Sequence, residues 1–578
     1  MILLLSGNEA AARGAWEAGV SLGTGYPGTP SSEILPALHK LGGVRAQWCV
    51  NEKVALEVAS GASWAGGRVL VTMKHVGLNV ASDPLFTLAY TGIRGGVVIA
   101  VADDPGMHSS QNEQDSRHYA RAAKVPLLEP ADSQEARDFT RLAFALSEEF
   151  DLPVILRLST RVSHSRGPVK RLGKVRPRGK MGFVKDPLKY VMIPAYARLR
   201  RLSLDRRLAR LARRAETLAC NRVEEGEQKA IITSGIAYQY CREVNPAAAC
   251  LKLGLVHPLP ERMIRDFCRC HRSVTVVEEL DPFLETEIKS LGLKIKGKAE
   301  SFRAGELNPD RVKNILLGRP DSFPPPRSLP PRPPVLCPGC PHRAVYIVLK
   351  KLRLIVTGDI GCYTLGTLSP LNALDTCLCM GAGIGQMEGL RALLPPEQRK
   401  KVVAVIGDST FVHSGITGLI DVVYNGWGGV VIILDNQTTA MTGHQHHPAT
   451  GRSLEGEPAP RLDLEEICRA SGVKRVEVIS SYDGSCLEAF LKDSLGRDEP
   501  SVLIARAPCV LLFKGSLSTV HQVELDLCRA CGRCLECGCP ALSRLSDGKV
   551  EINPRLCRGC SVCAKLCPFG AIHKRSEK

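Results

Sequence analysis

The chain has 578 residues, 44% of them hydrophobic, and this length predicts three to five domains with buried cores. No apolar run approaches the ~20 residues that a membrane-spanning helix needs, so we expect no membrane partner. Lysine and arginine outnumber aspartate and glutamate by 76 to 59, which gives a formal charge of +17. Residues 166–214 hold 17 of the basic residues but only Asp186 and Asp205 as acidic ones. Because this segment has few aromatic side chains and no nucleic-acid-binding motif, we expect no nucleic-acid partner.

The use of cysteine indicates a reducing compartment. The chain contains 23 cysteines, and Met1–Leu5 is too short, and lacks the basic flank, to be a signal peptide. In a chain without a secretory signal, cysteines are typical of metal and redox sites rather than of disulfides. We therefore expect a cytoplasmic protein that uses cysteine to bind metal.

Residues 1–165 alternate strand and helix patterns, which predicts a parallel α/β domain. Apolar runs predict strands over 69–73, 96–102 and 152–158. Asn51 and Glu52 open an Ala-rich segment that predicts a helix to about Gly66. Before it, residues 25–33 read as a loop, and their Ser and Glu are placed to cap the helix that follows.

The basic segment extends over 166–227 and is predicted to link two domains. Leu204, Leu208 and Leu211 share one face of a basic amphipathic helix within 202–214. We favour a solvated linker helix. The alternative is a docking patch for an acidic electron carrier or partner subunit, since such charge accelerates encounter.

Residues 228–318 form another unit with strand patterns, such as 230–234, and with no pattern that indicates catalysis. The stretch 319–335 follows it and is predicted to be a semi-rigid linker. Eight prolines between residues 320 and 334 exclude a helix or a central strand there.

Oxygen ligands lie at the predicted edge of a second parallel sheet. Apolar runs over 402–406 and 430–434 predict two buried strands; Gly407 and Asp408 follow the first, and Asn436 follows the second. Because ligands bind beyond the carboxyl ends of parallel strands, we expect Asp408 and Asn436 to lie side by side. Two hard oxygen ligands suit a Mg²⁺ ion that also holds a diphosphate, and Gly407 allows the backbone to approach it. The alternative is an ordinary strand end followed by an acidic turn.

Cysteines near residue 578 have the spacing of a bacterial ferredoxin. The last four are separated by two, two and three residues and are followed by proline; in that pattern the fourth cysteine ligates the other cluster of a pair. The predicted ligands are Cys528, Cys531, Cys534 and Cys567 for one [4Fe-4S] cluster, and Cys539, Cys557, Cys560 and Cys563 for a second. Cys537 is left over, because Cys539 is the one followed by proline. The alternative is a zinc ribbon. It explains less well a nested order of eight cysteines, in which each motif supplies three ligands of one cluster and the fourth ligand of the other.

Several strings resemble the thiamine-diphosphate-dependent 2-oxoacid:ferredoxin oxidoreductase family, and within it the large subunits that act on indolepyruvate. They are Tyr26–Ser32, Asn51–Glu52, Thr72–Asn79, Leu253–Leu255, Glu278–Phe283, Gly407–Ser409 with Asn436, and Thr439–Gln445. The resemblance covers essentially the whole chain and implies a multidomain α/β fold. The implied domains are a pyrimidine-binding parallel-sheet domain at 1–165, a transketolase C-terminal-like domain at 228–318, a diphosphate- and Mg²⁺-binding parallel-sheet domain at 336–512, and a two-cluster ferredoxin-like domain at 519–578.

By this resemblance, the first domain holds the catalytic residues. Glu52 takes the place of the glutamate that hydrogen-bonds the pyrimidine N1′ and acts as general acid and base. Thr29 faces the 2-oxo acid group of the substrate. Pyruvate-specific relatives hold the substrate carboxylate with an arginine in the stretch that matches residues 100–105, and this sequence has none there. Pyruvate is therefore not the expected substrate, and the partner of the carboxylate is unassigned.

The resemblance also implies a thiamine diphosphate site in the second parallel-sheet domain. Its residues are Gly407, Asp408, Ser409, Asn436, Thr438 and Met441. Asp408 and Asn436 are the side-chain ligands of Mg²⁺, and Thr438 offers its backbone carbonyl. Met441 is placed to bend the cofactor into its reactive shape, with core packing as the alternative.

A third [4Fe-4S] cluster close to the thiamine site is implied as well. Relatives bind it through a Cys-x-x-Cys pair, a Gly-Cys and one cysteine well beyond the diphosphate motif. Cys337, Cys340, Cys362 and Cys509 match that order. Buried inert cysteines are the alternative.

The implied reaction is the oxidative decarboxylation of aryl 2-oxo acids: indolepyruvate, with phenylpyruvate and hydroxyphenylpyruvate beside it. Coenzyme A takes the acyl group, which gives an aryl-acetyl-CoA and CO₂, and oxidised ferredoxin takes the electrons. Family members pair this subunit with a smaller beta subunit, in a heterodimer or heterotetramer. Two alternatives stay open: another 2-oxo acid, such as a branched-chain one, and an electron-transfer subunit with an inactive thiamine site.

Overall fold

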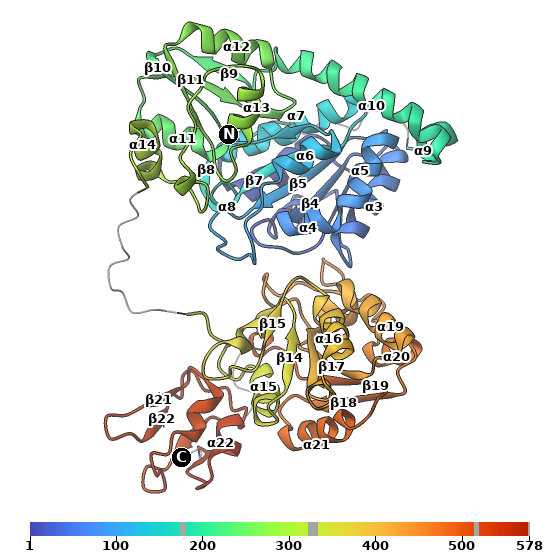
Figure 1. The fold of residues 1–578 in the computed structure, drawn as a ribbon, viewed down its shortest axis with the longest axis vertical. Helices are drawn as coiled ribbons and strands as arrows, with labels where there is room; N and C mark the ends of the chain where they lie inside the picture. The colour runs from blue at the N-terminus through green and yellow to red at the C-terminus, as the bar shows by residue number, and fades with distance from the viewer. Residues whose placement is uncertain (174–180, 322–332, 514–518, 576–578) are drawn as a thin grey trace. The chain divides into compact units, whose positions relative to one another are not determined.

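A computed structural model describes residues 1–173, 181–321, 333–513 and 519–575 (Figure 1). The chain divides into two compact units, residues 1–328 and 329–578. Most of the stretch predicted to be a Pro-rich linker, 322–332, lies outside the described residues. Within the described ranges no helix is long and apolar enough to cross a membrane, while the cytoplasmic location stays a prediction.

The main sheet of the first unit has the strand order β12-β6-β7-β5-β4-β2-β3. Its strands are β2 (Leu22–Gly25), β3 (Arg45–Trp48), β4 (Val69–Lys74), β5 (Val97–Asp103), β6 (Leu127–Leu128), β7 (Val154–Ser159) and β12 (Leu255–His257). All neighbours are parallel except β12, which runs antiparallel to β6. The three strands predicted from apolar runs are confirmed as β4, β5 and β7, and their residues are buried because helices cover both faces.

Helices connect these strands. They are α1 (Gly7–Glu17), α2 (Ile34–Lys40), α3 (Glu52–Trp64), α4 (His75–Val80), α5 (Ser82–Thr91), α6 (Arg117–Ala123), α7 (Ser133–Phe150) and α8 (Thr160–His164). The helix predicted from Asn51 is confirmed, and the Asn51 side chain caps it by accepting from the Val54 amide. The cap predicted for α2 is wrong. Glu33 makes no cap bond, because its carboxylate instead accepts from Asn8 Nδ2 at 2.8 Å.

A second sheet of this unit has the order β13-β10-β11-β9. It consists of β9 (Arg222–Glu224), β10 (Glu227–Ser234), β11 (Ala248–Leu253) and β13 (Ser273–Val277), and the associated helices are α11 (Gly235–Val244), α12 (Glu261–Cys270), α13 (Phe283–Ser290) and α14 (Pro309–Leu317). β12 comes from the same stretch of chain but joins the main sheet. The fully buried Arg117 of α6 also pairs with Glu278 at 2.5 Å. Residues 228–318 are therefore built into the first unit.

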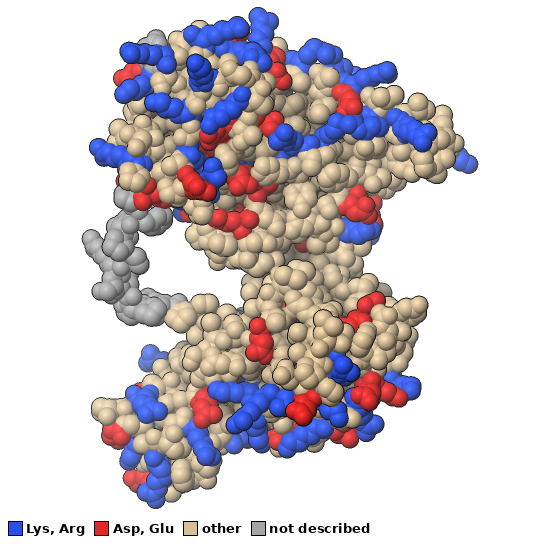
Figure 2. Space-filling view, in the orientation of Figure 1, with Lys and Arg blue, Asp and Glu red and all other residues tan. Residues whose placement is uncertain are grey.

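The basic segment is folded onto the first unit, which differs from the predicted linker. β8 (Arg166–Lys170) pairs with β1 (Ile2–Ser6), and α9 (Pro187–Tyr190) and α10 (Pro194–Ala215) follow. α10 packs against α5 and α7 with Leu204 and Leu211 fully buried. Arg207 is also buried and donates to the Asp151 and Ala89 carbonyls. The outward basic residues contribute to the lysine and arginine side chains seen around α10 and α12 in Figure 2. Residues 174–180 of the segment lie outside the described ranges.

The second unit is built on a parallel sheet with the order β15-β14-β16-β17-β19-β18. Its strands are β14 (Ile355–Gly358), β15 (Thr376–Cys377), β16 (Val402–Gly407), β17 (Gly429–Asp435), β18 (Arg475–Ser480) and β19 (Pro500–Arg506). Along β17, Val430, Ile432 and Leu434 belong to one core cluster, while Val431 and Ile433 belong to another. Because side chains alternate along a strand, both faces of this sheet are buried.

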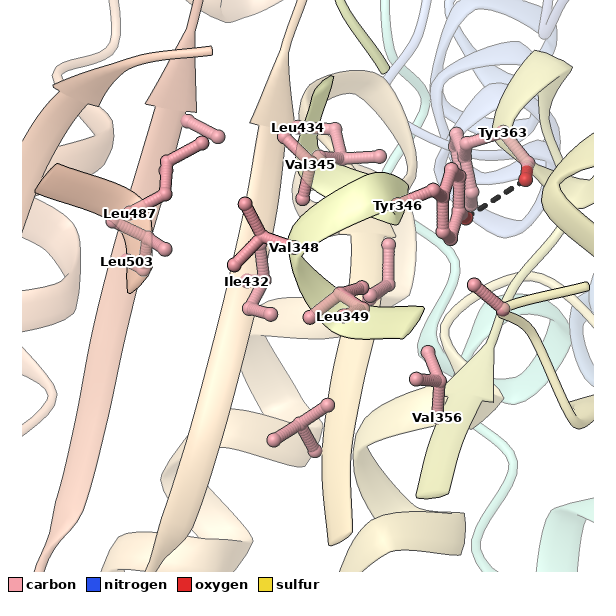
Figure 3. Packing of buried hydrophobic residues seen from close by; sticks show 14 of the residues in the cluster. Val345, Tyr346, Val348, Leu349, Val356, Tyr363, Ile432, Leu434, Leu487 and Leu503 are labelled. Atoms are coloured by element: carbon pink, nitrogen blue, oxygen red, sulfur yellow. Dashed lines mark hydrogen bonds between the residues drawn. The ribbon is translucent and has the colours of Figure 1, made fainter. Parts of the chain in front are cut away.

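Helices cover both faces of this sheet. α15 (His342–Lys351) and α21 (Gly484–Leu495) pack on one face, and α16 (Ala382–Leu393), α19 (Ile416–Asn425) and α20 (Leu464–Ala470) pack on the other. Figure 3 shows Val345, Val348 and Leu349 of α15 turned toward Ile432 and Leu434 of β17. The remaining residues form a small region with β20 (His521–Val523) paired to β23 (Ile572–Lys574), β21 (Leu542–Arg544) paired to β22 (Val550–Ile552), and α22 (Val562–Leu566).

Candidate functional site

The carboxyl ends of β16 and β17 bring Asp408 and Asn436 to one edge of the sheet in the second unit. The two strands are parallel neighbours, so the residues that follow them leave the sheet together. Asp408 is 2% exposed, and its carboxylate accepts the backbone amides of Ser409 and Gln437, each at 2.8 Å. These amides fix the carboxylate at the edge of the sheet.

The surroundings of Asp408 suit a divalent cation. The neighbouring carboxylate of Asp435 is satisfied by Arg506, whose Nε donates to it at 2.6 Å. In the described part of the chain, no lysine or arginine pairs with Asp408. His447 Nε2 lies 3.3 Å from its Oδ2, and both ring nitrogens of His447 are buried without a hydrogen bond in the described structure. A buried carboxylate that pairs with no lysine or arginine of the described residues, beside the amide oxygen of Asn436, is a donor set that fits Mg²⁺.

Ser409 and Thr438 are buried beside this edge. The Thr438 amide donates to Asn436 Oδ1 at 3.1 Å, and Ser409 Oγ accepts from Thr439 Oγ1 at 2.8 Å. Met441 is 53% exposed, so the alternative that it packs in a core is wrong.

Packing requires a glycine at position 407, for a reason that the sequence did not show. A methyl group built on Gly407 would lie 2.7 Å from Tyr363 Cε1, so the glycine makes room for a buried tyrosine ring. Tyr363 is itself held in place, because its carbonyl accepts from Tyr346 Oη at 2.8 Å (Figure 3). The close approach of a cofactor at Gly407 stays a prediction.

Two buried polar residues near this edge were not predicted. Asp359 follows β14 as Asp408 follows β16, and accepts the amides of Ile360 at 2.7 Å and Gly383 at 3.4 Å. Burial raises the pKa of Asp359 to about 7. His342 opens α15 with its Nε2 3.4 Å from Asn436 Nδ2, and burial lowers its pKa to about 4, so the ring is neutral at pH 7. A strand followed by Asp is a signal that could have found Asp359; no sequence pattern marks His342.

Cys337, Cys340, Cys362 and Cys509 gather at the same end of the sheet. Burial raises the pKa of the Cys340 thiol to about 12, and Cys362 and Cys337 add to the rise. The pKa of Cys362 is raised to about 11, first by burial and then by Cys509 and Cys337. Each thiol is thus within electrostatic reach of at least two others. Such a set fits an iron–sulfur cluster, because bound iron favours the thiolates that burial alone opposes.

Two cavities in the C-terminal region each have four cysteines in their lining. The lining of one includes Cys528, Cys531, Cys534 and Cys567. The lining of the other includes Cys539, Cys557, Cys560 and Cys563. Each set contains the four cysteines that the nested pattern assigns to one cluster, which fits two iron–sulfur clusters. Cys537 lines neither cavity; it is 1% exposed, and its thiol donates to the Cys534 carbonyl at 3.0 Å.

The turn between Cys337 and Cys340 contacts the second of these cavities. Gly339 forms part of the cavity lining, and its carbonyl accepts from Tyr482 Oη at 2.7 Å. The buried Arg343 donates to the carbonyls of Cys337 at 3.3 Å and Cys537 at 2.8 Å. The guanidinium therefore ties the Cys-x-x-Cys turn to the ferredoxin-like region. Sequence reasoning missed Arg343, because the contact spans almost 200 residues.

In the first unit, Glu52 and Thr29 lie beyond the carboxyl ends of the main-sheet strands. Glu52 is 4% exposed and packs over α4, where a methyl group on Gly77 would lie 2.5 Å from its Oε1. Thr29 lies in the loop after β2, and its carbonyl accepts from Ser109 Oγ at 3.3 Å. Lys74, the last residue of β4, lies against the same loop and was not predicted. A lysine that ends an otherwise apolar strand was the available signal.

Three family models match this chain. Residues 13–200 match the thiamine diphosphate-binding region of pyruvate flavodoxin/ferredoxin oxidoreductases, and residues 359–505 match the C-terminal TPP-binding domain of thiamine pyrophosphate enzymes. Residues 550–573 match a 4Fe-4S binding domain. These matches confirm the predicted multidomain α/β fold, with its thiamine-diphosphate-binding domains and a C-terminal iron–sulfur domain.

Curated relatives match over the full length. The indolepyruvate oxidoreductase subunit IorA of Archaeoglobus fulgidus is 43% identical over 99% of this chain and 97% of its own length. Its counterpart from Pyrococcus horikoshii is 39% identical over 100% of this chain and 97% of its own length. The 2-oxoglutarate synthase subunit KorA of Methanothermobacter thermautotrophicus is 30% identical over 33% of this chain and 53% of its own length. The chain therefore belongs to the 2-oxoacid:ferredoxin oxidoreductase family, among the indolepyruvate oxidoreductase IorA subunits.

Proposed function

We propose that this chain is the large subunit of an enzyme that oxidatively decarboxylates aryl 2-oxo acids, with indolepyruvate as the principal substrate and phenylpyruvate and hydroxyphenylpyruvate as further ones. Coenzyme A and oxidised ferredoxin are the co-substrates, and the products are an aryl-acetyl-CoA, CO₂ and reduced ferredoxin. The names of the full-length relatives support indolepyruvate, and the lack of an arginine within residues 100–105 argues against pyruvate.

One contact carries the proposal: the Cys509 amide donates to the Asn436 carbonyl at 2.9 Å. Asn436 belongs to the proposed Mg²⁺ site and Cys509 to the proposed proximal cluster. Electron transfer from a thiamine site to iron requires the two to be neighbours. A decarboxylase that passes no electrons would have no use for thiols at this place.

The residues of the chain have separate tasks in this reaction. Asp408, Asn436 and the Thr438 carbonyl would hold Mg²⁺, and Gly407, Ser409 and Met441 would lie beside them at the thiamine diphosphate site. Glu52 would hold the proton at the pyrimidine N1′, and Thr29 would face the substrate. Bound thiamine diphosphate would supply carbanion stabilisation at the former carbonyl carbon.

The three cysteine sets support a route for the electrons. We assign a proximal [4Fe-4S] cluster to Cys337, Cys340, Cys362 and Cys509. Gly339 belongs to the lining of the cavity of Cys539, Cys557, Cys560 and Cys563, which supports a cluster there as the next carrier. The cluster of Cys528, Cys531, Cys534 and Cys567 would then deliver electrons to ferredoxin. A smaller beta subunit completes the enzyme, in keeping with relatives that are themselves named as subunits.

An anaerobic bleaching experiment tests the proposal. The chain and its small subunit are mixed with Mg²⁺, thiamine diphosphate, coenzyme A and indolepyruvate, and the visible iron–sulfur absorbance is followed. We expect bleaching that requires both thiamine diphosphate and the 2-oxo acid. Faster bleaching by a branched-chain 2-oxo acid would replace the aryl assignment. Bleaching by dithionite but by no 2-oxo acid would favour an electron-transfer subunit with an inactive thiamine site.

A further inference from the structure

A 2-oxo acid substrate carries a carboxylate, and the first unit must provide a group that recognises it. Residues 100–105, the last four residues of β5 and the two that follow it, contain neither arginine nor lysine and so supply no cation. A carboxylate that leaves water needs a charged or hydrogen-bonding partner to offset its desolvation. The partner of the carboxylate must then be another group beside Thr29 and Glu52.

Lys74 is such a side chain. It ends β4, the parallel neighbour of β2, and so lies beside the loop that contains Thr29. A methyl group on Gly28 would lie 2.9 Å from Lys74 Cγ and 3.0 Å from its Cδ, so the alkyl chain runs along this loop. Lys74 Nζ donates to the Ser109 carbonyl at 3.3 Å, and Ser109 Oγ donates to the Thr29 carbonyl at 3.3 Å. The ammonium, Ser109 and Thr29 therefore form one group.

The ammonium of Lys74 has no carboxylate partner within ion-pair distance in the described residues. The nearby Asp104 accepts instead from the Ser109 amide at 2.8 Å, Ser110 Oγ at 2.7 Å and Thr160 Oγ1 at 2.7 Å. Burial lowers the pKa of Lys74 to about 8, while the charges of Asp104 and Glu52 oppose the decrease. Lys74 is thus a cation at pH 7, beside carboxylates that stabilise its charge without binding it.

The buried lysines of this unit, Lys252 and Lys298, have closer partners than the half-buried Lys74. Lys252 Nζ donates to Glu135 at 2.5 Å. Lys298 Nζ donates to the carbonyls of Glu278 and Leu280 at 2.6 and 2.5 Å. Lys74 makes one long bond to a neutral acceptor, although an ammonium has three donors. Within the described residues, Lys74 therefore differs from Lys252 and Lys298 in having neither a carboxylate acceptor nor a short hydrogen bond.

We propose that Lys74 binds the carboxylate of the 2-oxo acid substrate and is the specificity residue that replaces the arginine of the pyruvate-specific relatives. This assignment rests on the function proposed above. In decarboxylation, the bond between the carboxylate carbon and the keto carbon breaks, its electron pair stays on the keto carbon, and the carboxylate leaves as neutral CO₂. The ion pair with Lys74 therefore weakens as the reaction proceeds. Such a contact contributes mainly to substrate binding, and so to KM rather than kcat.

Steady-state kinetics of the complex of large and small subunits test the assignment. The variants are Lys74→Met, which keeps the chain length without the charge, and Lys74→Arg, which keeps the charge. Lys40→Met, an exposed lysine of α2, is the matched control. We expect Lys74→Met to raise the KM for phenylpyruvate roughly ten- to hundredfold, the range for a hydrogen bond to a charged group. Lys74→Arg should raise it less, and Lys40→Met should leave it unchanged.

A pair of inhibitors separates carboxylate binding from a structural role. 3-Phenylpropanoate has the carboxylate, and 3-phenylpropanamide has a neutral amide of the same shape. The unmodified enzyme should prefer the acid, and Lys74→Met should lose that preference while it still binds thiamine diphosphate. An unchanged preference for the acid in Lys74→Met would overturn the assignment.

A measurement on the unmodified complex tests the assignment even if the Lys74→Met variant fails to assemble. Lysines are acetylated with acetic anhydride, and peptide mass spectrometry gives the modified fraction of Lys74. We expect 3-phenylpropanoate to protect Lys74 and 3-phenylpropanamide not to; equal protection by both, or protection by thiamine diphosphate alone, contradicts the assignment. If the unmodified complex turns over no aryl 2-oxo acid, the proposed function itself fails. Normal turnover with an unaffected Lys74→Met overturns only the role of Lys74.

Discussion

Glu52 is a buried carboxylate whose helix does not depend on it. Asn51 caps α3, so replacing Glu52 by glutamine leaves the start of the helix intact. Because Glu52 is proposed to exchange the proton at the pyrimidine, Glu52→Gln should lower kcat for 2-oxo-acid-dependent ferredoxin reduction by about 10²- to 10⁴-fold. Glu57→Gln, on the same helix but half exposed and paired with Lys53, serves as control and should be near normal. A loss of less than tenfold in Glu52→Gln would remove Glu52 from the mechanism.

His257 links acid pH to the stability of the first unit. Burial, and then the charge of Arg121, lowers the pKa of this β12 residue to about 4. The unfolded chain, with a histidine pKa near 6.5, binds more protons between these values, so stability falls as the pH decreases through 6.5. At pH 5 the loss is about 2 kcal/mol, from ~1.36 kcal/mol per pH unit.

His257→Gln should remove this loss. Denaturant unfolding of the unmodified chain and the variant at pH 7.5 and pH 5 measures it. We expect the free energy of unfolding of the variant to fall less on acidification, by about 2 kcal/mol. Parallel decreases in both proteins would show that His257 is protonated equally easily in the folded and unfolded states.

At the scale of elements, α10 shows how a basic composition can hide a packed helix. The charge of the segment predicts a solvated helix. Arg207, however, donates to a backbone carbonyl of α5 and to that of the residue after α7, and no local sequence pattern predicts these two contacts. Leu211→Ala, at a fully buried position, should cost about 2–5 kcal/mol of unfolding free energy through the cavity it leaves. Leu202→Ala, at a position 57% exposed on the same helix, should cost far less. Equal effects in denaturant unfolding would argue that α10 is not packed in solution.

In the ferredoxin-like region, Cys537 and Cys539 are expected to differ in their role at the cluster. Cys539 lines the same cavity as Cys557, Cys560 and Cys563, whereas the Cys537 thiol donates to the Cys534 carbonyl. Cys539→Ser should therefore lower the iron content by one cluster and remove one reduced-cluster signal from the electron paramagnetic resonance spectrum. Cys537→Ser should keep both. The reverse result would exchange the two cysteines in the ligand set.

At the scale of the whole molecule, the second unit has its own core and the proposed iron ligands. The hydrophobic cores on the two faces of its sheet consist only of residues from 329–578. A chain of residues 329–578 should therefore fold and bind as much iron as the complete chain. It should not oxidise 2-oxo acids, because Glu52 and Thr29 belong to the first unit. Iron analysis and the bleaching assay check both points; loss of iron from the shorter chain would show that its clusters depend on residues 1–328.

The sequence by itself determined what depends on local spacing. Short continuous apolar runs predicted β4, β5, β7, β16 and β17, because a strand covered on both faces of its sheet is apolar at successive residues. The spacing of the cysteines predicted two sets of four, each with three ligands from one short loop and the fourth from the other motif, and each set lines its own cavity. Asp408 and Asn436 could be paired because both follow strands of one parallel sheet.

Only the tertiary structure decided which distant residues meet. Lys74 reaches the loop of Thr29, Arg343 joins the Cys337 turn to Cys537, and the basic α10 lies on α5 and α7. These contacts depend on the path of the chain and on which buried donors and acceptors still need a hydrogen-bond partner. Hydrogen bonds between distant segments leave no repeating pattern in the sequence. The sequence therefore sets the kind of chemistry, and the fold selects the side chains beside it.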